Sequence, residues 1–195
     1  MAYSRMPREL DCVRACVVPR GVVRGRKNPL HWGLAIRLKR ARKAAELDRQ
    51  SLTNKALMAD GSAVRALEHA ERVPRLDTVE RIAYALSVSP AFLAFGIQAE
   101  AAPMAKGLRS DGVGQRLADE RTARGLSVLA VAKLAGLSHT AVGNVERGTM
   151  PTLATAEALA KALDLSPAWL AYGLGDRAAA RRGRRAQPDS AAPAH

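Results

Sequence analysis

Two segments of this chain repeat one another closely. Residues 74–96 and 151–173 align without a gap, and 13 of their 23 positions carry identical residues. Their offset of 77 residues exceeds the period of about 20–50 residues that is typical of solenoid repeats. The chain has 195 residues, enough for two small domains that each bury a core. The repeat therefore predicts two tandem copies of one small domain.

The match between the copies extends upstream of these two segments. Arg37-Leu38 in the first copy pairs with Arg116-Leu117 in the second. The offset falls from 79 through 78 to 77 along the chain, so the copies differ in length by single residues. Because insertions are tolerated in loops, we expect these differences to lie in the turns between helices.

Composition and capping residues predict that both copies are helical. Ala, Leu and Arg are common, whereas aromatic residues make up only 4% of the chain, which argues against a β-sandwich or barrel. In the second copy, Ser127 and Ser138 are suited to cap helices, and Gly136 is suited to end one. The helices expected in this copy cover residues 114–123, 128–135, 139–147, 153–163 and 168–172. The first copy should repeat these five helices.

The tight turn Gly136-Leu137-Ser138 is typical of a helix-turn-helix connection, with glycine first and an apolar residue second. In the run Leu126–Gly173, the sequence Glu-Arg-Gly ends the third helix, and Ser166-Pro167 begins the last one. This run resembles the Cro/CI-type helix-turn-helix domains of the XRE family. The resemblance covers residues 113–173 closely and 32–96 more loosely. It implies an all-α chain of two tandem lambda-repressor-like five-helix domains that binds double-stranded DNA.

These boundaries divide the chain into five segments. They are a basic arm (1–30), helix-turn-helix domain 1 (31–96), a linker (97–112), helix-turn-helix domain 2 (113–175) and a basic tail (176–195). The linker is expected to be flexible. The arm and the tail are expected to be disordered without a partner, because they lack hydrophobic periodicity.

The resemblance places the third helix of domain 2, residues 139–147, in the major groove of DNA. Asn144 can pair with an adenine edge, Thr140 can contact a thymine methyl group, and His139 can donate to guanine. The simpler interpretation of His139 and Asn144, as ordinary exposed polar residues, stays open. Backbone amides around Ser127 and Ser138 can hold phosphate. The expected DNA-binding residues of domain 2 are Ser138, His139, Thr140, Ala141, Asn144 and Arg147.

Domain 1 is expected to be a degenerate reader. Its base-reading positions correspond to Gly61, Ser62 and Ala66, which offer little direct readout. In relatives, the second helix usually begins with a Gln whose side-chain amide contacts phosphate. Domain 2, unlike domain 1, is affected here, because it has Val128 at that position, which puts the phosphate contact in doubt. The expected DNA-binding residues of domain 1 are Arg49, Gln50, Ser62 and Arg65.

Two charged pairs recur at matched positions of the copies. They are Arg42 with Glu68, and Arg121 with Glu146. In relatives the corresponding residues often form a partly buried ion pair that ties the first helix to the end of the third. The resemblance therefore implies a structural role for these four residues.

Positive charge is concentrated at both ends of the chain. The net charge is +13, of which residues 1–43 carry +10 and residues 176–195 carry +3. Such a surplus favours a polyanionic partner, nucleic acid before a membrane. Two roles stay open for the arm and the tail, namely solubility and binding to the DNA backbone.

Other classes of function find no support in the sequence. The motifs typical of phosphate-binding loops, zinc proteases and serine hydrolases are absent. Cys12 and Cys16 fall short of the four ligands that a zinc site needs. We therefore expect no enzyme activity, no cofactor and no metal. No apolar stretch approaches the 18 residues of a membrane span, and no signal peptide is evident, which predicts a cytoplasmic, nucleoid-associated protein.

Two functions remain open at this stage. The first is a sequence-specific transcriptional regulator, a repressor, that reads DNA with residues 139–147. The second is an antitoxin-like or regulator-binding protein-interaction module with the same fold, which Val128 and the poor reading set of domain 1 favour. Sixteen linker residues can span roughly 50 Å, and half-sites lie about 34–36 Å apart. The sequence thus permits an intramolecular pseudo-dimer, as well as self-association.

Overall fold

Short helices form every regular element in the described part of the chain. The computed structural model describes residues 29–59, 62–99 and 107–178, without the side chains of residues 29–32. We refer to residues 29–99 as the N-terminal half and to residues 107–178 as the C-terminal half. The prediction of an all-α fold is confirmed.

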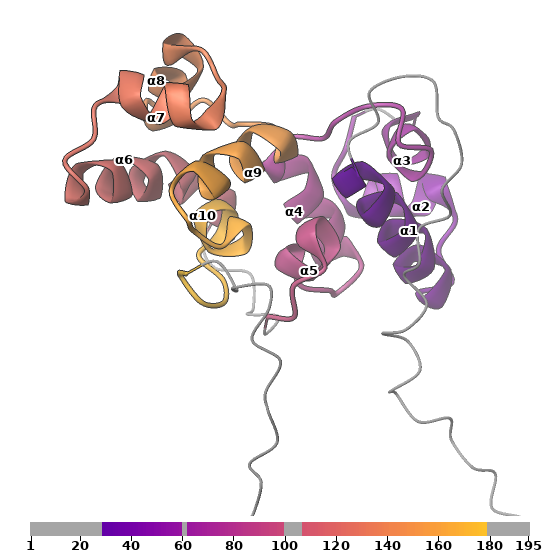
Figure 1. The fold of residues 1–195 in the computed structure, drawn as a ribbon. Helices are drawn as coiled ribbons and strands as arrows, with labels where there is room; N and C mark the ends of the chain where they lie inside the picture. The colour runs from indigo at the N-terminus through magenta and orange to yellow at the C-terminus, as the bar shows by residue number, and fades with distance from the viewer. Residues whose placement is uncertain (1–28, 60–61, 100–106, 179–195) are drawn as a thin grey trace, which may run out of the picture.

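Each half contains five α-helices. The N-terminal half consists of α1 (Pro29–Ala44), α2 (Arg49–Lys55), α3 (Ser62–Glu68), α4 (Leu76–Ala85) and α5 (Pro90–Phe95). The C-terminal half opens with a 3-10 helix, η2 (Arg109–Gly112), followed by α6 (Val113–Ala123), α7 (Val128–Ala135), α8 (His139–Glu146), α9 (Leu153–Ala162) and α10 (Pro167–Tyr172). In Figure 1, α4, α5, α9 and α10 occupy the centre, with α1–α3 on one side and α6–α8 on the other.

The helix ends lie close to those predicted, but the segment boundaries differ. Helix α8 ends at Glu146 rather than at residue 147, and α1 begins at Pro29, within the predicted arm. The linker was expected to be flexible, and this is wrong for residues 109–112, which form η2 and pack against α4. The predicted tail also begins too early, because Arg177 and Ala178 contact the C-terminal half.

Leucines at equivalent positions form the core of both halves. Leu38 of α1 and Leu117 of α6 are fully buried, as are Leu76 of α4 and Leu153 of α9. Burying such a side chain contributes about 1.5–3 kcal/mol. The repeated leucine pattern therefore sets the same packing positions in each half.

An arginine on the first helix of each half binds the end of the last helix. Arg37 Nε donates to Leu93 O over 2.9 Å, and its Nη2 donates to the next carbonyl. Arg116 Nε donates to Leu170 O over 2.8 Å, again with Nη2 on the following carbonyl. These bonds satisfy carbonyl groups that a helix C-terminus leaves without partners.

The two halves exchange backbone hydrogen bonds at the centre. Leu76 N donates to Pro151 O over 3.1 Å, and Leu153 N donates to Pro74 O over 2.9 Å. The two leucines are equivalent in the repeat, and so are the two prolines. The exchange is therefore reciprocal, with each half donating once and accepting once.

Helices α5 and α10 pack against each other next to this exchange. The rings of Phe95 and Tyr172, which are equivalent in the repeat, lie 6.3 Å apart between centroids. The Tyr172 hydroxyl donates to Leu76 O of the other half over 3.4 Å. Complete burial raises the pKa of Tyr172 well above its ordinary value. Aromatic pairs of this kind contribute about 0.5–1.5 kcal/mol beyond their buried area.

A buried carboxylate on α4 holds the C-terminal end of the linker. Glu80 is fully buried and accepts from Arg109 N over 2.7 Å and from Ser110 N over 2.8 Å. It also accepts from the Tyr84 hydroxyl over 2.7 Å. Burial, together with this bond, raises the pKa of Tyr84 to about 12. Glu80 thereby fixes the start of the C-terminal half on the N-terminal half.

Residues beyond α10 also belong to the fold. Arg177 Nε lies 2.5 Å from Glu120 Oε1 on α6, and its guanidinium lies over the Trp169 ring at 5.7 Å. Arg177 O accepts from Ser166 N over 2.9 Å. These contacts explain why the ordered C-terminal half extends past the predicted end at residue 175.

Candidate nucleic-acid interface

Helices α7 and α8 form a capped helix-turn-helix. The Ser127 hydroxyl accepts from Ala130 N, and the Ser138 hydroxyl accepts from Ala141 N, both over 3.1 Å. Gly136 has a φ of 64°, a conformation that other residues adopt at a cost. The helix axes differ in direction by 116°, within the range of about 90–120° for this motif.

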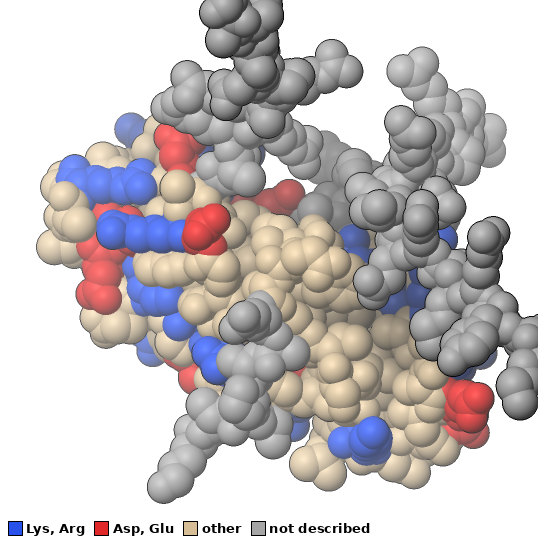
Figure 2. Space-filling view, turned by 90° about the horizontal axis from the view of Figure 1, so that it is seen from below, with Lys and Arg blue, Asp and Glu red and all other residues tan. Residues whose placement is uncertain are grey.

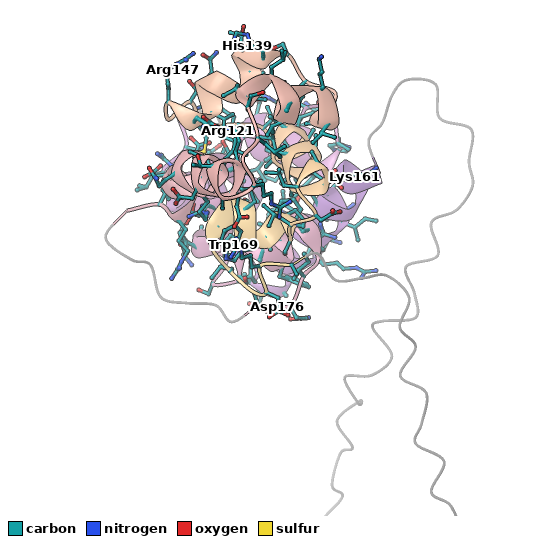
Figure 3. All side chains as sticks on the ribbon, turned by 60° about the vertical axis from the view of Figure 1, so that its left-hand side comes forward. Arg121, His139, Arg147, Lys161, Trp169 and Asp176 are labelled. Atoms are coloured by element: carbon teal, nitrogen blue, oxygen red, sulfur yellow. The ribbon has the colours of Figure 1, made fainter. Side chains whose placement is uncertain are left out.

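The N-terminal end of α8 is exposed. Ser138, His139 and Thr140 are exposed, whereas Ala141 is half-buried. Figure 3 places His139 and Arg147 at the end of the molecule opposite Asp176 and Trp169. The opposite side, seen in Figure 2, carries mostly uncharged residues at its centre. Polar side chains at the start of α8 are thus free of the packed core.

One hydrogen bond orients the amide of the main base-reading candidate. Arg147 Nη2 donates to Asn144 Oδ1, and Asn144 is half-buried while Arg147 is exposed. The bond directs Oδ1 toward Arg147 and leaves the two N–H donors of the amide on the other side. Because an amide oxygen has a second lone pair, Asn144 can still form a two-bond contact with an adenine.

The end of α8 is attached firmly to α6. Arg121 donates to both oxygens of Glu146, over 2.6 and 3.2 Å, and to Leu126 O over 3.0 Å. The hydrogen bond with Glu146 raises the pKa of Arg121 above its ordinary value. On α6, Gly114 lies so close to Val145 O that a Cβ atom there would clash. This close contact fixes the distance between the two helices.

The N-terminal half repeats the ion pair but with an additional arginine. Arg42 Nε and Arg49 Nε each lie 2.7 Å from Glu68, on different carboxylate oxygens. Burial raises the pKa of Glu68, but the hydrogen bonds from both arginines outweigh it and leave the pKa below its ordinary value. Arg49, predicted to contact DNA, is therefore already engaged by a carboxylate.

The other predicted contacts of the N-terminal half are dispersed. Ser62 and Arg65 are exposed on α3, and Ala66 is half-buried. Gln50 is exposed on α2 and donates to Asn54 Oδ1 over 3.2 Å. Gly61 lies outside the described residues, as do Cys12 and Cys16.

Sequence reasoning missed three important residues. Arg37 and Arg116 were visible as a repeated Arg-Leu pair, but their carbonyl partners lie more than 50 residues away. Glu80 was missed because Glu157 occupies the equivalent position, and nothing in the repeat indicates that Glu80 is the one of the two that holds the linker.

Comparison with known proteins identifies the class of domain. The family model described as helix-turn-helix matches residues 117–170, which span α7, the turn and α8. No curated protein and no solved structure gives a significant match to the chain. The match supports a helix-turn-helix domain of the Cro/CI type over residues 117–170.

No single helix among the described residues is long and apolar enough to span a membrane, and α7 with α8 meets that test only as a pair bent by 116°. Within the same residues, no group of three or more His, Cys, Asp or Glu side chains is arranged to hold a metal ion.

Proposed function

We propose that the chain is a transcriptional repressor that recognises a specific sequence in double-stranded DNA through α8. The observation that carries the proposal is the exposed start of α8 within the helix-turn-helix domain. His139, Thr140 and Asn144 read base edges, and Ala141 lies near the groove floor. Arg147 contacts phosphate, as do backbone amides in the first turns of α7 and α8.

The N-terminal half is, in this proposal, a diverged copy of the same domain. Its support is that equivalent residues make equivalent contacts, such as Arg37 with Leu93 O and Arg116 with Leu170 O. The ion pairs of Arg42 and Arg121 give a second example. The copy keeps the helices but presents Ser62 and Ala66 where base-reading side chains would lie, and Arg65 contacts phosphate.

The two halves act together as an intramolecular pseudo-dimer. Supporting observations are the reciprocal bonds between residues 74–76 and 151–153 and the contact of Phe95 with Tyr172. Figure 1 draws α3 and α8 on the same, upper side of the molecule. The operator is then asymmetric, with a defined half-site opposite α8 and a loose one opposite α3. The basic arm and tail add affinity without specificity.

A protein-interaction module is the second candidate function. The observation that favours it is the surface of α7, where Leu129 is 53% and Leu134 is 60% exposed. A helix that only contacts phosphate has no need of exposed leucines, whereas a partner protein can cover them.

The experiment that tests DNA reading compares α8 with α3 in the full chain. Duplexes are selected from random sequence with the unaltered protein, and binding of the best site is measured for Asn144→Ala and Thr140→Ala. Each should lose about 1–3 kcal/mol and relax base preference at one position. Arg65→Ala, the control on α3, should weaken all duplexes alike and leave the preference unchanged. An unaltered preference in both α8 variants would contradict the proposal.

A further inference from the structure

Several differences between the two halves lie around one cavity. A cavity of about 460 Å³ lies between residues 57–59, α3, the α3–α4 loop and the start of α4. Apolar residues line one part of it, and arginines line another. We call it the arginine cavity. Its lining includes Leu57, Met58, Arg72, Val73, Arg75 and Arg81.

Leu57 at the edge of this cavity is unfavourable for the fold. Its φ is 52° and its side chain is 81% exposed. The equivalent residue of the C-terminal half is Gly136, with a φ of 64°. A left-handed conformation costs a leucine about 1–2 kcal/mol, and an exposed side chain regains nothing from burial. A strained, exposed apolar residue points to a contact outside the chain.

Val73 adds a second apolar group at the same place. The loop from Ala70 to Pro74 has one residue more than the equivalent loop from Gly148 to Pro151. That longer loop places Val73 on the cavity with 38% of its surface exposed, next to the partly buried Met58. The cavity therefore presents an apolar surface to solvent.

Three arginines make the rest of the cavity basic. Arg72, Arg75 and Arg81 correspond to Met150, Thr152 and Ala158 in the C-terminal half. Among the described lining residues Asp77 is the acidic one, and it lies 3.7 Å from Arg75. Within the described residues, neither Arg72 nor Arg81 forms an ion pair. Among these residues, no carboxylate neutralises the charges of Arg72 and Arg81, which are therefore suited to an acidic ligand.

We propose that the arginine cavity binds an acidic segment of a partner protein that inserts a large apolar side chain. The positive charge of the cavity favours a negatively charged occupant. Residues 1–28 carry a net +5 and residues 179–195 a net +3, so both ends of this chain are repelled. A DNA backbone has the charge but offers no apolar group to Leu57 and Val73. This site goes beyond the proposed DNA reading and does not depend on it.

The test measures binding of labelled peptides to the full-length chain by fluorescence anisotropy. One peptide consists of Glu with Leu along one helical face, and the other has every Leu replaced by Ser. Saturable binding of the Glu/Leu peptide is expected, with clearly weaker binding of the Glu/Ser peptide. Arg72→Glu combined with Arg81→Glu should weaken it about tenfold or more, because two attractive pairs become repulsive.

The variant Leu57→Gly distinguishes a loss of binding from a loss of folding. It should weaken the Glu/Leu peptide about fivefold by removing an apolar contact, and at the same time raise Tm by relieving strain. The matched control is Lys133→Glu with Lys161→Glu, beside the cavity of about 710 Å³ between α7 and α9. It should leave peptide binding within about twofold of the unaltered chain, because both lysines lie outside the arginine cavity.

Several outcomes would overturn the proposal. They are no saturable binding, equal binding of the two peptides, or an equal loss in the lysine control. A fourth is that Arg72→Glu with Arg81→Glu abolishes binding to a random duplex but leaves the peptide unaffected, since the arginines would then contact DNA. The α8 variants test DNA reading separately, so either idea can fail alone.

Discussion

The two halves differ most at the turns that follow their first three helices. Each half places one residue of each turn in the left-handed region, with φ between 52° and 97°. The C-terminal half uses glycine at all three, and the N-terminal half uses other residues. The equivalent pairs are Glu46 with Gly125, Leu57 with Gly136, and Ala70 with Gly148. The backbone path is thus kept where its preferred residue is lost, because packing of the buried leucines determines it.

The comparison also separates what holds the fold from what binds a ligand. The bonds from Arg37 and Arg116 to the last helix, the ion pairs and the leucine core recur in both halves. The exposed side chains on α3 and α8 do not recur. Contacts that stabilise the fold are therefore shared by the two halves, whereas the exposed residues of α3 and α8 are particular to each half.

The largest expected effect concerns a matched pair of glutamates. Glu80→Gln should destabilise the protein by about 3 kcal/mol, because at least one buried donor among its three partners loses its acceptor. Glu157→Gln, at the equivalent and half-buried position, should cost less than about 1 kcal/mol. Urea unfolding of both variants measures the difference. Equal losses would mean that Glu80 does not hold the linker.

A smaller difference is expected between the two ion pairs. Arg121→Met leaves Glu146 without its cation and should cost about 2 kcal/mol. Arg42→Met should cost only about 1 kcal/mol, because Arg49 still pairs with Glu68. Each arginine also donates to a backbone carbonyl, so both variants lose one such hydrogen bond and it does not contribute to the difference between them. If Arg42→Met proves the more harmful, the second arginine gives no compensation.

Exchange of the turn residues should shift stability in opposite directions. Leu57→Gly should stabilise the chain by about 0.5–1 kcal/mol, and Gly136→Leu should destabilise it by about 1 kcal/mol. Both changes lie at exposed positions, so core packing is unaffected. Differential scanning calorimetry gives the sign directly. A loss of stability in Leu57→Gly would show that Leu57 is not strained.

The smallest effect is a dependence on pH. The pKa of Glu68 is lowered from its ordinary value of 4.5 in the folded protein. The ionised Glu68 therefore stabilises the fold above that value, and this stabilisation is lost as pH falls through the folded pKa. The Tm of Glu68→Gln should therefore fall less than that of the unaltered chain from about pH 5 to about pH 3. The exposed Glu71→Gln serves as control and should follow the unaltered chain. Parallel curves for Glu68→Gln would contradict the prediction.

Local signals made the helices predictable. Ser127, Ser138 and Gly136 lie where caps and turns require them, and the C-terminal half follows the predicted helices within a residue or two. The exposure of His139 followed from the same pattern. What the sequence could not reveal is long-range pairing, such as Arg116 with Leu170 O, because no residue pattern marks a carbonyl acceptor.

The linker and the turn at Leu57 were unpredictable for different reasons. Residues 97–112 have the composition of a flexible segment. The C-terminal end of this segment is ordered because its backbone donates to Glu80, which lies on a helix and is 29 residues before Arg109. Leu57 has no turn signal, since its left-handed conformation is imposed by the packing of α2 and α3. In both cases tertiary contacts override local preference.

The reciprocal bonds between residues 74–76 and 151–153 have a consequence for how the molecule behaves on dilution. A pair assembled from separate chains dissociates at low protein concentration, whereas two partners on one polypeptide meet at an effective concentration set by the tether. For the proposed pseudo-dimer, occupancy of a DNA site should then rise with the first power of protein concentration. A homodimer interface must also fit its own copy. Here each side is encoded separately, so Phe95 can face Tyr172 and each partner can change alone.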